Sequence, residues 1–436
     1  MHRILIAAHG FPPTHSAGAE RRAERMAQWF ARQGHSVQVF AVEKLDAPEF
    51  RVETREQDGF PVHRLYYDVK AGDHFHNLYD YPPVGEAFRA LIERESFDLV
   101  HIISGYLLGG QVIHAARERG LPVVLTLTEY WFMCARLNLF QATDQVCSGP
   151  ESDSKCARCL LEDLRRYRLP AKTMPKLMDV FWKVADQTPL VQPMTQQVAE
   201  RRVVLKQALE SAQLVICPSH FLMDKFNEFH FDASRFTYLR QGLNVPDPLP
   251  TPVPSQGTLR LGYVGQVKSH KGVDLLVDAA IALLKAGRKV SLDLWGSLTE
   301  DPDYVARLRT LSEPYPAIRW NGRYTGAKVW DVLANLDALV IPSRWYENSP
   351  NTILEAYAMR LPVIGTNLGG MAELIEHDRT GLLFHLNDAA DLQRQIERLL
   401  DEPQLLDRLR QSIPPVKTVD QEMRETLELY QHILAG

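Results

Sequence analysis

The chain has 436 residues, which is too long for one ordinary hydrophobic core and suits two domains. Hydrophobic residues make up 45% of the sequence and charged residues 24%, as in ordinary globular proteins. The formal net charge of −5 provides no basic field for nucleic acid, and no apolar run is long enough to span a bilayer. The first residues, Met1 to Ile6, lead directly into a strand-like stretch without the features of a signal peptide, so we expect a cytoplasmic protein.

The first part of the chain alternates predicted strands with predicted helices. Apolar residues at helical spacing from Ala23 to Phe30 predict a helix that Gly34 ends. Continuous apolar strands separated by helices are typical of a parallel sheet that is covered on both faces. The predicted strands are 2–8, 36–42, 60–66, 98–103 and 122–127, and further helices are predicted at 85–95 and 108–119.

Residues from about 134 to 205 break this alternation, and we predict that they form an insertion in the first domain. They contain four of the five cysteines, followed by a basic, proline-punctuated stretch in which Phe181 and Trp182 are interleaved. The basic residues are Arg165, Arg166, Arg168, Lys172, Lys176 and Lys183. The alternation resumes with a strand at 214–218, whose Cys217 is expected to be a buried thiol, a helix from Ser219 and a strand at 235–239.

A proline-rich segment, 246–257, is the clearest candidate for a linker, because its five prolines favour a stiff and extended connection. Strand and helix then alternate again. The predicted strands are 259–264, 290–295, 318–320, 338–342 and 362–365, and the helices are 273–286, 304–311, 327–335 and one from Asn351.

The predicted fold class is therefore α/β, with two doubly wound domains. The first is 1–245, the second is 258–416, and the last segment, 417–436, is expected to carry a helix that packs back on the first domain. Ligands of such domain pairs bind at the carboxyl ends of the strands, in the cleft between the two sheets.

The segment that follows the predicted strand 338–342 has the features of an anion site. A loop leads to a helix start at Asn351 and Thr352, where free backbone N–H groups suit a diphosphate. Glu347 and Glu355 flank this site and are suited to accept hydrogen bonds from sugar and ribose hydroxyls. The alternative is that Glu347 is a neighbour of the helix cap and Glu355 a solvated helix residue.

The second domain resembles the group 1 catalytic domain of family 4 glycosyltransferases, which are retaining enzymes with the GT-B fold of two facing Rossmann-like domains. Glu347 and Glu355 reproduce the Glu-x7-Glu motif of that family. The segment 263–274 resembles its glycine–lysine loop, and 361–375 with 380–384 resembles its next strand, turn and strand. The resemblance covers the whole second domain and, more loosely, most of the first.

The resemblance implies a role for each residue of the donor site. Glu347 would contact hydroxyls of the donor sugar, Glu355 the nucleotide ribose, and Lys271 the diphosphate. Gly265 would leave room for the backbone to approach the diphosphate. The family usually has arginine after this glycine, whereas this chain has Gln266, and we predict that Arg344 replaces the missing charge.

The first domain is expected to bind the acceptor, and its loops depart from the family pattern. The loop 10–20 resembles the family's Gly-Gly-Ala-Glu loop with Ala17 in place of the first glycine, so Gly18 would approach a phosphate or the acceptor. Relatives commonly carry His-Asp where this chain has Thr128-Glu129, and Glu129 is predicted to polarise the acceptor hydroxyl. His101 lies at another position where relatives often carry histidine. A simple turn and a structural histidine are the alternatives.

The four clustered cysteines predict a structural zinc site, because thiolates at such spacings can hold a tetrahedral zinc in a reducing compartment. A similar four-cysteine insertion occurs in a subset of the family, and the alternative is four unligated thiols. No metal or other cofactor is expected to be required for catalysis, because GT-B enzymes place protein charges on the diphosphate. The cysteines are Cys134, Cys147, Cys156 and Cys159.

Two interpretations of the basic insertion stay open. It is either an interfacial surface that approaches an anionic membrane and a lipid-linked acceptor, or a set of helices with solvated basic faces, and the second is favoured. The first would make the protein peripheral at the inner face of the membrane.

The resemblance implies retaining transfer of a sugar from a nucleoside diphosphate sugar to a hydroxyl of a glycan, lipid-linked or small-molecule acceptor. Bacterial cell-surface polysaccharide or glycoconjugate synthesis is the expected setting. Gln266 and Thr128 keep two alternatives open: an epimerase-like nucleotide-sugar enzyme that transfers nothing, and a non-catalytic nucleotide-sugar-binding protein.

Overall fold

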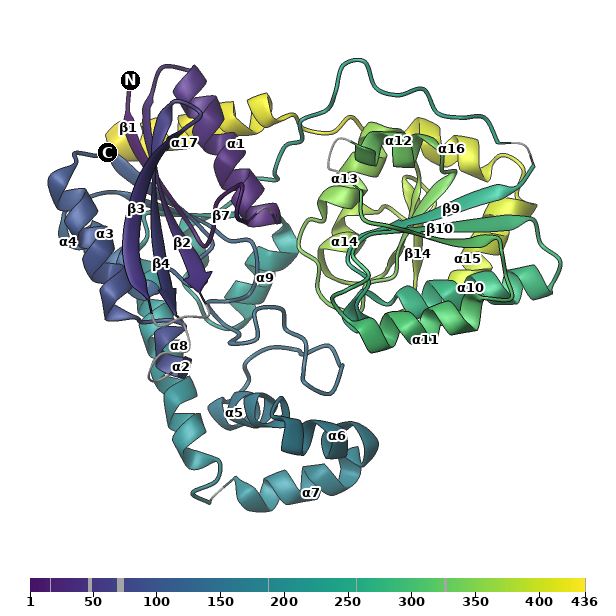
Figure 1. Cartoon of the computed structure of the whole chain (residues 1–436), viewed down its shortest axis with the longest axis horizontal. Coiled ribbons are helices and arrows are strands. Elements are labelled where there is room, and N and C mark those ends of the chain that lie inside the picture. Colours follow the sequence, from purple (N-terminus) through teal and green to yellow (C-terminus); the bar gives the residue numbers. More distant parts are fainter. Residues whose placement is uncertain are drawn as a thin grey trace. The chain divides into compact units, whose positions relative to one another are not determined.

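The computed structural model divides the chain into two compact α/β units (Figure 1). The first unit comprises 1–143, 147–240 and 419–436, and the second comprises 144–146 and 241–418. The structure describes all residues except Ser16, 46–48, 69–73, Gln187, Gln256, 325–327 and Gly436. For Lys44, Leu45 and His74 it describes the backbone and not the side chain. Among the described residues, no helix is long and apolar enough to cross a bilayer.

The first unit is built on an eight-stranded sheet with the order β3-β4-β2-β1-β5-β6-β7-β8. All neighbouring pairs are parallel except β3 and β4, which pair as an antiparallel edge. Sequence reasoning missed β3, because its charged residues hide the apolar alternation that marks a strand. The strands are β1 Arg3–Ala8, β2 Ser36–Leu45, β3 Phe50–Gln57, β4 Phe60–Asp68, β5 Leu99–Ile103, β6 Val123–Thr126, β7 Leu214–Cys217 and β8 Phe236–Tyr238.

Helices cover this sheet and position the loops that follow the carboxyl ends of its strands. Helix α1 packs against β1, β2 and β5, and its apolar stripe fills the same core as Ile4 and Ile6. Helix α4 packs against both α3 and α8. The helices of this unit are α1 Gly18–Arg32, α2 His74–Asn77, α3 Pro82–Arg94, α4 Gly110–Glu118, α5 Asp153–Glu162, α6 Arg165–Thr173, α7 Pro175–Ala185, α8 Gln192–Ser211, α9 His220–Glu228, the 3-10 turn η1 Ala233–Arg235 and α17 Val419–Ala435.

The last helix, α17, belongs to the first unit although it follows the second in sequence. Its Glu422 forms a buried ion pair with Arg22 of α1 at 2.6 Å. The ring of Tyr430 stacks on Phe30 with 5.3 Å between centroids. The chain therefore returns to close the core of its first sheet.

The insertion forms a small helical lobe of α5, α6 and α7 beside α8 (Figure 1). The lobe has its own hydrophobic cluster, which includes Met178, Trp182 and Val198. Helix α8 contacts both α5 and α4, so it connects the lobe to the helices that cover the sheet. The helix continues to Ser211, beyond the predicted end of the insertion at 205.

The second unit has a six-stranded parallel sheet with the order β11-β10-β9-β12-β13-β14. Strands β9 and β10 have the predicted limits, and the predicted helix 327–335 begins at Ala327, which lies outside the described residues. The strands are β9 Leu259–Val264, β10 Val290–Trp295, β11 Ile318–Gly322, β12 Ala338–Ile341, β13 Val363–Thr366 and β14 Gly381–Phe384. The helices are the 3-10 turn η2 Ser269–Lys271, α10 Val273–Lys285, α11 Pro302–Ser312, α12 Val329–Ala334, α13 Asn351–Ala358, α14 Gly369–Leu374, α15 Ala389–Asp401 and α16 Leu405–Ser412.

The proline-rich segment 246–257 does not lie at the unit boundary. The chain changes units between Arg240 and Gln241, ahead of this segment. The amide of Val253 donates to the carbonyl of Ala334 at 2.8 Å, and Val253 accepts from Arg260 at 2.6 Å, so the segment runs along the second unit. Proline makes a segment stiff and extended whether or not it connects two domains, which is why composition misplaced the boundary.

Candidate functional site

The glycine–lysine loop of the second unit is pressed against the end of β12. Gly272 has a left-handed backbone with φ of +66°, and a Cβ there would lie 2.0 Å from the carbonyl oxygen of Pro342. Only glycine fits this position without a backbone shift. The preceding residue is Lys271, the last residue of η2, so this close approach brings its side chain to the carboxyl end of β12.

Lys271 and Glu347 form an ion pair at this point. The ammonium group of Lys271 lies 2.6 Å from Oε1 of Glu347 and 4.7 Å from the centroid of the Trp345 ring. The hydroxyl of Ser343 and the indole N–H of Trp345 each donate to the same Oε1 at 2.9 Å. The lysine and glutamate side chains are 20% and 12% exposed. All three donors converge on Oε1 and orient the carboxylate, and no described residue donates to Oε2.

Helix α14 fixes the backbone around Glu347. The amide of Gly370 donates to the carbonyl oxygen of Glu347 at 2.7 Å. A Cβ at Gly370 would lie 1.7 Å from the carbonyl oxygen of Asn348, so a larger residue would displace the loop. The segment 361–375 was noted above only as part of a resemblance. Its helix α14 supports the loop that carries Glu347 through these contacts.

The start of α13 lies directly after this loop. Asn351 and Thr352 are half-buried in its first turn, and no described side chain caps this helix. Gln241 donates from Nε2 to the carbonyl of Ser349 at 2.6 Å and to Oδ1 of Asn351 at 3.0 Å. Sequence reasoning missed Gln241, because no local pattern links residue 241 to residue 351. Glu355 lies one turn further along the helix and is half-buried.

Arg344 is held by an acidic partner at the glycine–lysine loop. Its guanidinium donates to both carboxylate oxygens of Asp274 at 2.7 Å and to the carbonyl of Ser269 at 3.0 Å. The pKa of Asp274 is lowered, because the hydrogen bonds from Arg344 and Tyr304 outweigh its burial. Arg344 therefore fixes the glycine–lysine loop, and its contact with a donor phosphate stays a prediction. Gln266 is exposed.

In the first unit, polar groups gather at the carboxyl ends of β1, β5 and β6. Glu129 accepts a hydrogen bond from Ser104 at 2.9 Å and another from Thr128. Burial raises the pKa of the Glu129 carboxyl, the charge of Glu20 raises it further, and His9 opposes the shift. This cluster therefore contains a carboxyl group that takes up a proton more readily than an exposed glutamate does.

Sequence reasoning missed His9 and Glu20, which lie beside Glu129 in the charge balance of this cluster. His9 Nε2 lies 3.6 Å from Oε1 of Glu20. Within the described part of the chain, the buried His9 Nδ1 and Glu20 Oε2 have no hydrogen-bond partner. Buried polar atoms without partners are rare and mark a place where a ligand or water completes the bonding. The position of His9 at the end of β1 was the signal that could have pointed to it.

A buried ion pair between Arg64 and Glu43 holds the loop after β1 in place. Arg64 lies 2.6 Å from Glu43 and also donates to the carbonyl oxygens of Phe11 and Pro12. The loop then leads to Ala17 and Gly18, which are exposed at the start of α1. A Cβ at Gly18 would meet nothing within 4 Å, so the fold itself does not require glycine there.

His101 is a core residue and not part of the acceptor loop for which it was predicted. It is fully buried, its Nδ1 bonds with the hydroxyl of Tyr430, and its Nε2 bonds with Thr126 at 2.7 Å. Burial lowers the pKa of its imidazole to about 3. Both ring nitrogens are thus used to join β5, β6 and α17, which leaves neither for a substrate.

Replacing His101 by alanine should destabilise the first unit by about 3 kcal/mol, because the change leaves a cavity and two buried hydroxyls without their partner. Chemical denaturation monitored by circular dichroism measures this loss. At a temperature where the variant is still folded, we expect its activity to stay within about threefold of wild type. A large loss of rate in the fully folded variant would instead indicate that His101 acts in the acceptor site.

The predicted zinc site is not supported. Among the described residues, the four cysteines do not bring three sulfur atoms within 4.8 Å of one another, and the residues that meet this spacing are His385, Asp388 and Asp391. Burial raises the pKa of the Cys156 thiol to about 12 and that of Cys159 to about 11. The four cysteines are partly buried and form no disulfide, and Cys156 packs against the lobe core.

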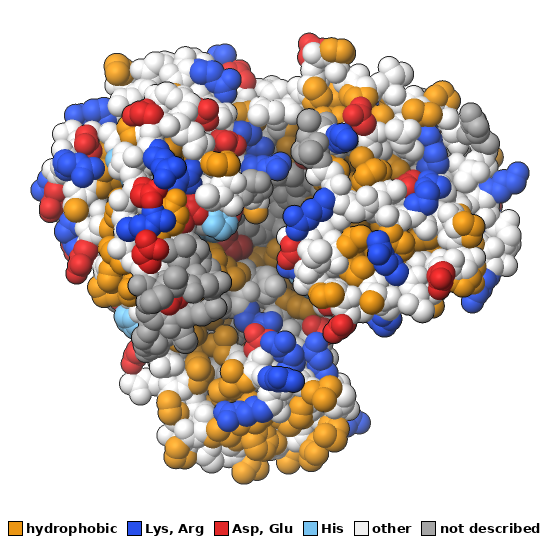
Figure 2. Space-filling model, viewed as in Figure 1, with side chains coloured by type: hydrophobic (Ala, Val, Ile, Leu, Met, Phe, Trp, Pro, Cys, Tyr) orange, Lys and Arg blue, Asp and Glu red, His pale blue; other side chains and the backbone are white. Residues whose placement is uncertain are grey.

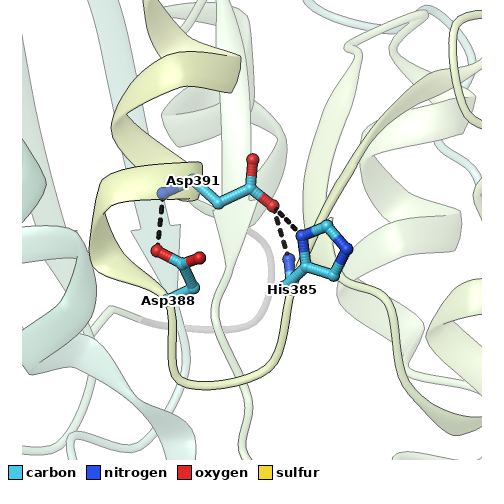
Figure 3. A group of neighbouring side chains, drawn as sticks. All are labelled: His385, Asp388 and Asp391. Carbon is cyan, nitrogen blue, oxygen red and sulfur yellow. Dashed lines mark hydrogen bonds and ion pairs between the residues drawn. The ribbon is translucent and has the colours of Figure 1, made fainter.

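The group of His385, Asp388 and Asp391 is a helix cap (Figure 3). Asp388 caps α15 by accepting from the amide of Asp391 at 2.8 Å. Asp391 accepts from the backbone amide of His385 at 2.8 Å and contacts its Nδ1 at 2.5 Å. The helix cap and the hydrogen bonds between Asp391 and His385 account for the contacts in this group without a metal.

Each of the two units matches a family of known proteins. Residues 258–402 match the family described as "Glycosyl transferases group 1", and residues 17–242, more than half of the chain, match the "Glycosyl transferase 4-like domain". Among solved structures, a sucrose-phosphate synthase from Thermosynechococcus elongatus superposes with a TM-score of 0.68 at 19% identity, covering 99% of both chains. The Anabaena protein HepE, solved in complex with UDP, superposes with a TM-score of 0.66 at 16% identity, covering 99% of this chain and 100% of that one.

Curated relatives match shorter segments. The alpha-D-kanosaminyltransferase of Streptomyces kanamyceticus is 28% identical over 154 residues, which are 35% of this chain and 39% of that protein. A D-inositol 3-phosphate glycosyltransferase of Pseudarthrobacter chlorophenolicus is 32% identical over 151 residues, which are 34% of this chain and 36% of that protein. The chain thus spans less than half the length of these curated relatives.

Two parallel α/β units of this kind define the GT-B class of fold, as the structural neighbours show. The matches place the chain within that class: it belongs to the glycosyltransferase family of the group 1 and 4-like domains.

Proposed function

We propose that the protein transfers a sugar from a nucleoside diphosphate sugar to an acceptor hydroxyl, with the donor bound in the second unit. The observation that carries this proposal is the Lys271–Glu347 pair, held at 2.6 Å beside the start of α13. Lys271 and the free N–H groups at Asn351 and Thr352 supply positive potential for a diphosphate. A donor phosphate would compete with Glu347 for Lys271, which frees the glutamate to accept from sugar hydroxyls.

The departure of the diphosphate is the step that this site would promote. Negative charge grows on the diphosphate as the bond to the anomeric carbon breaks, and preorganised cations and N–H groups stabilise such charge strongly. Glu355 would bind the nucleotide ribose, and Gly265 would let the backbone approach the diphosphate, as the family resemblance implies. We propose retention at the anomeric carbon on the same resemblance.

The acceptor site is proposed to lie at the Glu129 cluster of the first unit, with His9 and Glu20 beside it and Gly18 at its rim. A carboxylate at Glu129 would accept a hydrogen bond from the acceptor hydroxyl and increase its nucleophilicity. A glycan or lipid-linked acceptor of cell-surface polysaccharide or glycoconjugate synthesis fits the family, and the proposed location is cytoplasmic and peripheral at the membrane.

Replacing Glu129 by glutamine should lower kcat/KM by about a hundredfold, because the amide accepts the hydroxyl proton poorly. The wild-type rate should also fall as pH decreases through the raised pKa of Glu129, since only the ionised carboxylate can act. The variant should lose that acidic limb. A pH–rate profile of both proteins measures the effect, and an unchanged acidic limb in the variant would assign it to another group.

Donor binding can be tested with a panel of nucleotide sugars in a thermal-shift assay. A donor at a hundred times its Kd stabilises the protein by about 2.7 kcal/mol, so the true donor should raise Tm clearly while unrelated nucleotides do not. If no nucleoside diphosphate sugar shifts Tm, the proposed donor site is refuted. Gln266 stands in place of the usual arginine and is the reason for the alternative of a non-catalytic nucleotide-sugar-binding protein. Donor binding without transfer to any acceptor would favour that alternative.

A further inference from the structure

The helical lobe of the first unit carries an unusual concentration of exposed apolar side chains. The segment 164–184, only 21 of the 436 residues, contains half of the large hydrophobic residues that are exposed in the described chain. Figure 2 shows hydrophobic and basic side chains together on this lobe. The exposed apolar residues are Leu164, Leu169, Met174, Leu177, Val180, Phe181 and Val184, which we call the lobe surface.

Helix α7 shows how this surface is arranged. Its inward stripe, Met178, Trp182 and Ala185, is buried in the lobe core. A second apolar stripe follows at helical spacing i, i+3, i+4 and i+7, and it faces solvent with Val184 72% exposed. The second stripe consists of Leu177, Val180, Phe181 and Val184. One stripe is enough to hold α7 in the fold, so the core does not account for the second.

Basic side chains border the exposed stripe. In a helix of 100° per residue, Lys176 and Lys183 fall on one side of this stripe, and both are exposed. Across 164–184 there are six lysines and arginines but one acidic residue, Asp179, which pairs with Arg158. This concentrated positive charge contrasts with the net charge of −5 of the whole chain.

We propose that the lobe surface docks the protein on an anionic phospholipid membrane. Apolar side chains flanked by lysine and arginine match the boundary between acyl chains and acidic headgroups. Charge complementarity favours this occupant over a second copy of the chain, because two copies of the surface would bring like charges together. The proposal adds to the proposed function by placing the acceptor at a lipid surface, but membrane binding itself requires no sugar transfer.

Vesicle co-sedimentation of the full-length protein tests the proposal. Vesicles of phosphatidylcholine with phosphatidylglycerol should pellet the protein, and pure phosphatidylcholine vesicles should pellet much less. Each basic residue near an anionic surface contributes about 1 kcal/mol, so Lys176→Gln with Lys183→Gln should weaken the partition coefficient by roughly 25-fold. Leu177→Ser with Val184→Ser should weaken it by at least about tenfold, because both side chains lose apolar burial in the membrane.

Matched controls make the same chemical changes elsewhere. Val203→Ser with Leu311→Ser alters exposed apolar residues outside the lobe surface, and Lys285→Gln with Lys289→Gln removes exposed lysines of the second unit. Both controls should bind vesicles as wild type does. Failure of the wild-type protein to bind anionic vesicles would overturn the proposal and favour an acidic protein partner, and full binding by the lobe variants would also overturn it. Nucleotide-sugar binding by the same preparations is measured separately, so this failure is distinguishable from failure of the donor site.

Discussion

Replacing Lys271 by alanine should lower kcat/KM for sugar transfer by about a thousandfold and weaken the binding of the nucleoside diphosphate as well. The ammonium group is the cation that the structure aims at the loop before α13, and removing one such preorganised donor typically costs a hundredfold to a thousandfold in rate. The loss also leaves Glu347 without its partner at 2.6 Å, so an uncompensated carboxylate would repel the phosphates.

Initial rates and diphosphate titrations of Lys271→Ala measure both effects. Lys285→Ala is the matched control, because this lysine is exposed at the end of α10 that is opposite to the glycine–lysine loop. The control should keep wild-type rate and affinity. A Lys271→Ala protein that transfers sugar within about fivefold of wild type would remove Lys271 from the donor site.

Replacing Glu347 by glutamine should also reduce transfer by about a hundredfold to a thousandfold, but with a different signature. The change keeps the size of the side chain and removes the charge that accepts from Lys271, Ser343 and Trp345. In the proposed site, Glu347 contacts the sugar and not the diphosphate. We therefore expect the free nucleoside diphosphate to bind within about fivefold of wild type, while transfer is lost.

Calorimetric titration with the diphosphate, set beside transfer rates, separates the two variants. Lys271→Ala should lose both binding and transfer, and Glu347→Gln should lose transfer alone. Glu313→Gln, an exposed change after α11, serves as the control for the substitution itself. Equal loss of diphosphate binding in both variants would contradict the division of roles between lysine and glutamate.

The sequence was sufficient to predict the alternating α/β fold, because continuous apolar strands such as β9 and β10 carry their own signal. The edge strand β3 was not predicted, because its charged residues mask the alternation of apolar and polar residues that marks a strand. The close packing of the glycine–lysine loop was also readable, since the close approach at Gly272 leaves a local glycine signature. What these cases share is that the information lies within a few neighbouring residues.

The remaining features depend on partners far away in the sequence. His101 was misassigned because its partner Tyr430 lies 329 residues away, on a helix that returns to the first unit. The pairing of Arg344 with Asp274, 70 residues earlier, was missed because no local pattern indicates it. Gln241 was missed for the same reason, and so were His9 and Glu20, because Glu129, whose charge balance they share, lies more than a hundred residues further along the chain. Spacing of cysteines likewise suggested zinc, but among the described residues no three of their sulfur atoms lie within 4.8 Å of one another.

The measurement that tests the central claim most directly is mass-spectrometric detection of a glycosylated product. Wild-type protein would be incubated with the nucleotide sugar that gives the largest thermal shift and with a panel of glycan and lipid-linked acceptors. We predict an acceptor product that carries one added sugar, with nucleoside diphosphate released in equal amount and neither formed by Glu347→Gln. Donor turnover that needs no acceptor, or donor binding with no product from any acceptor, would contradict the assignment of sugar transfer to this site.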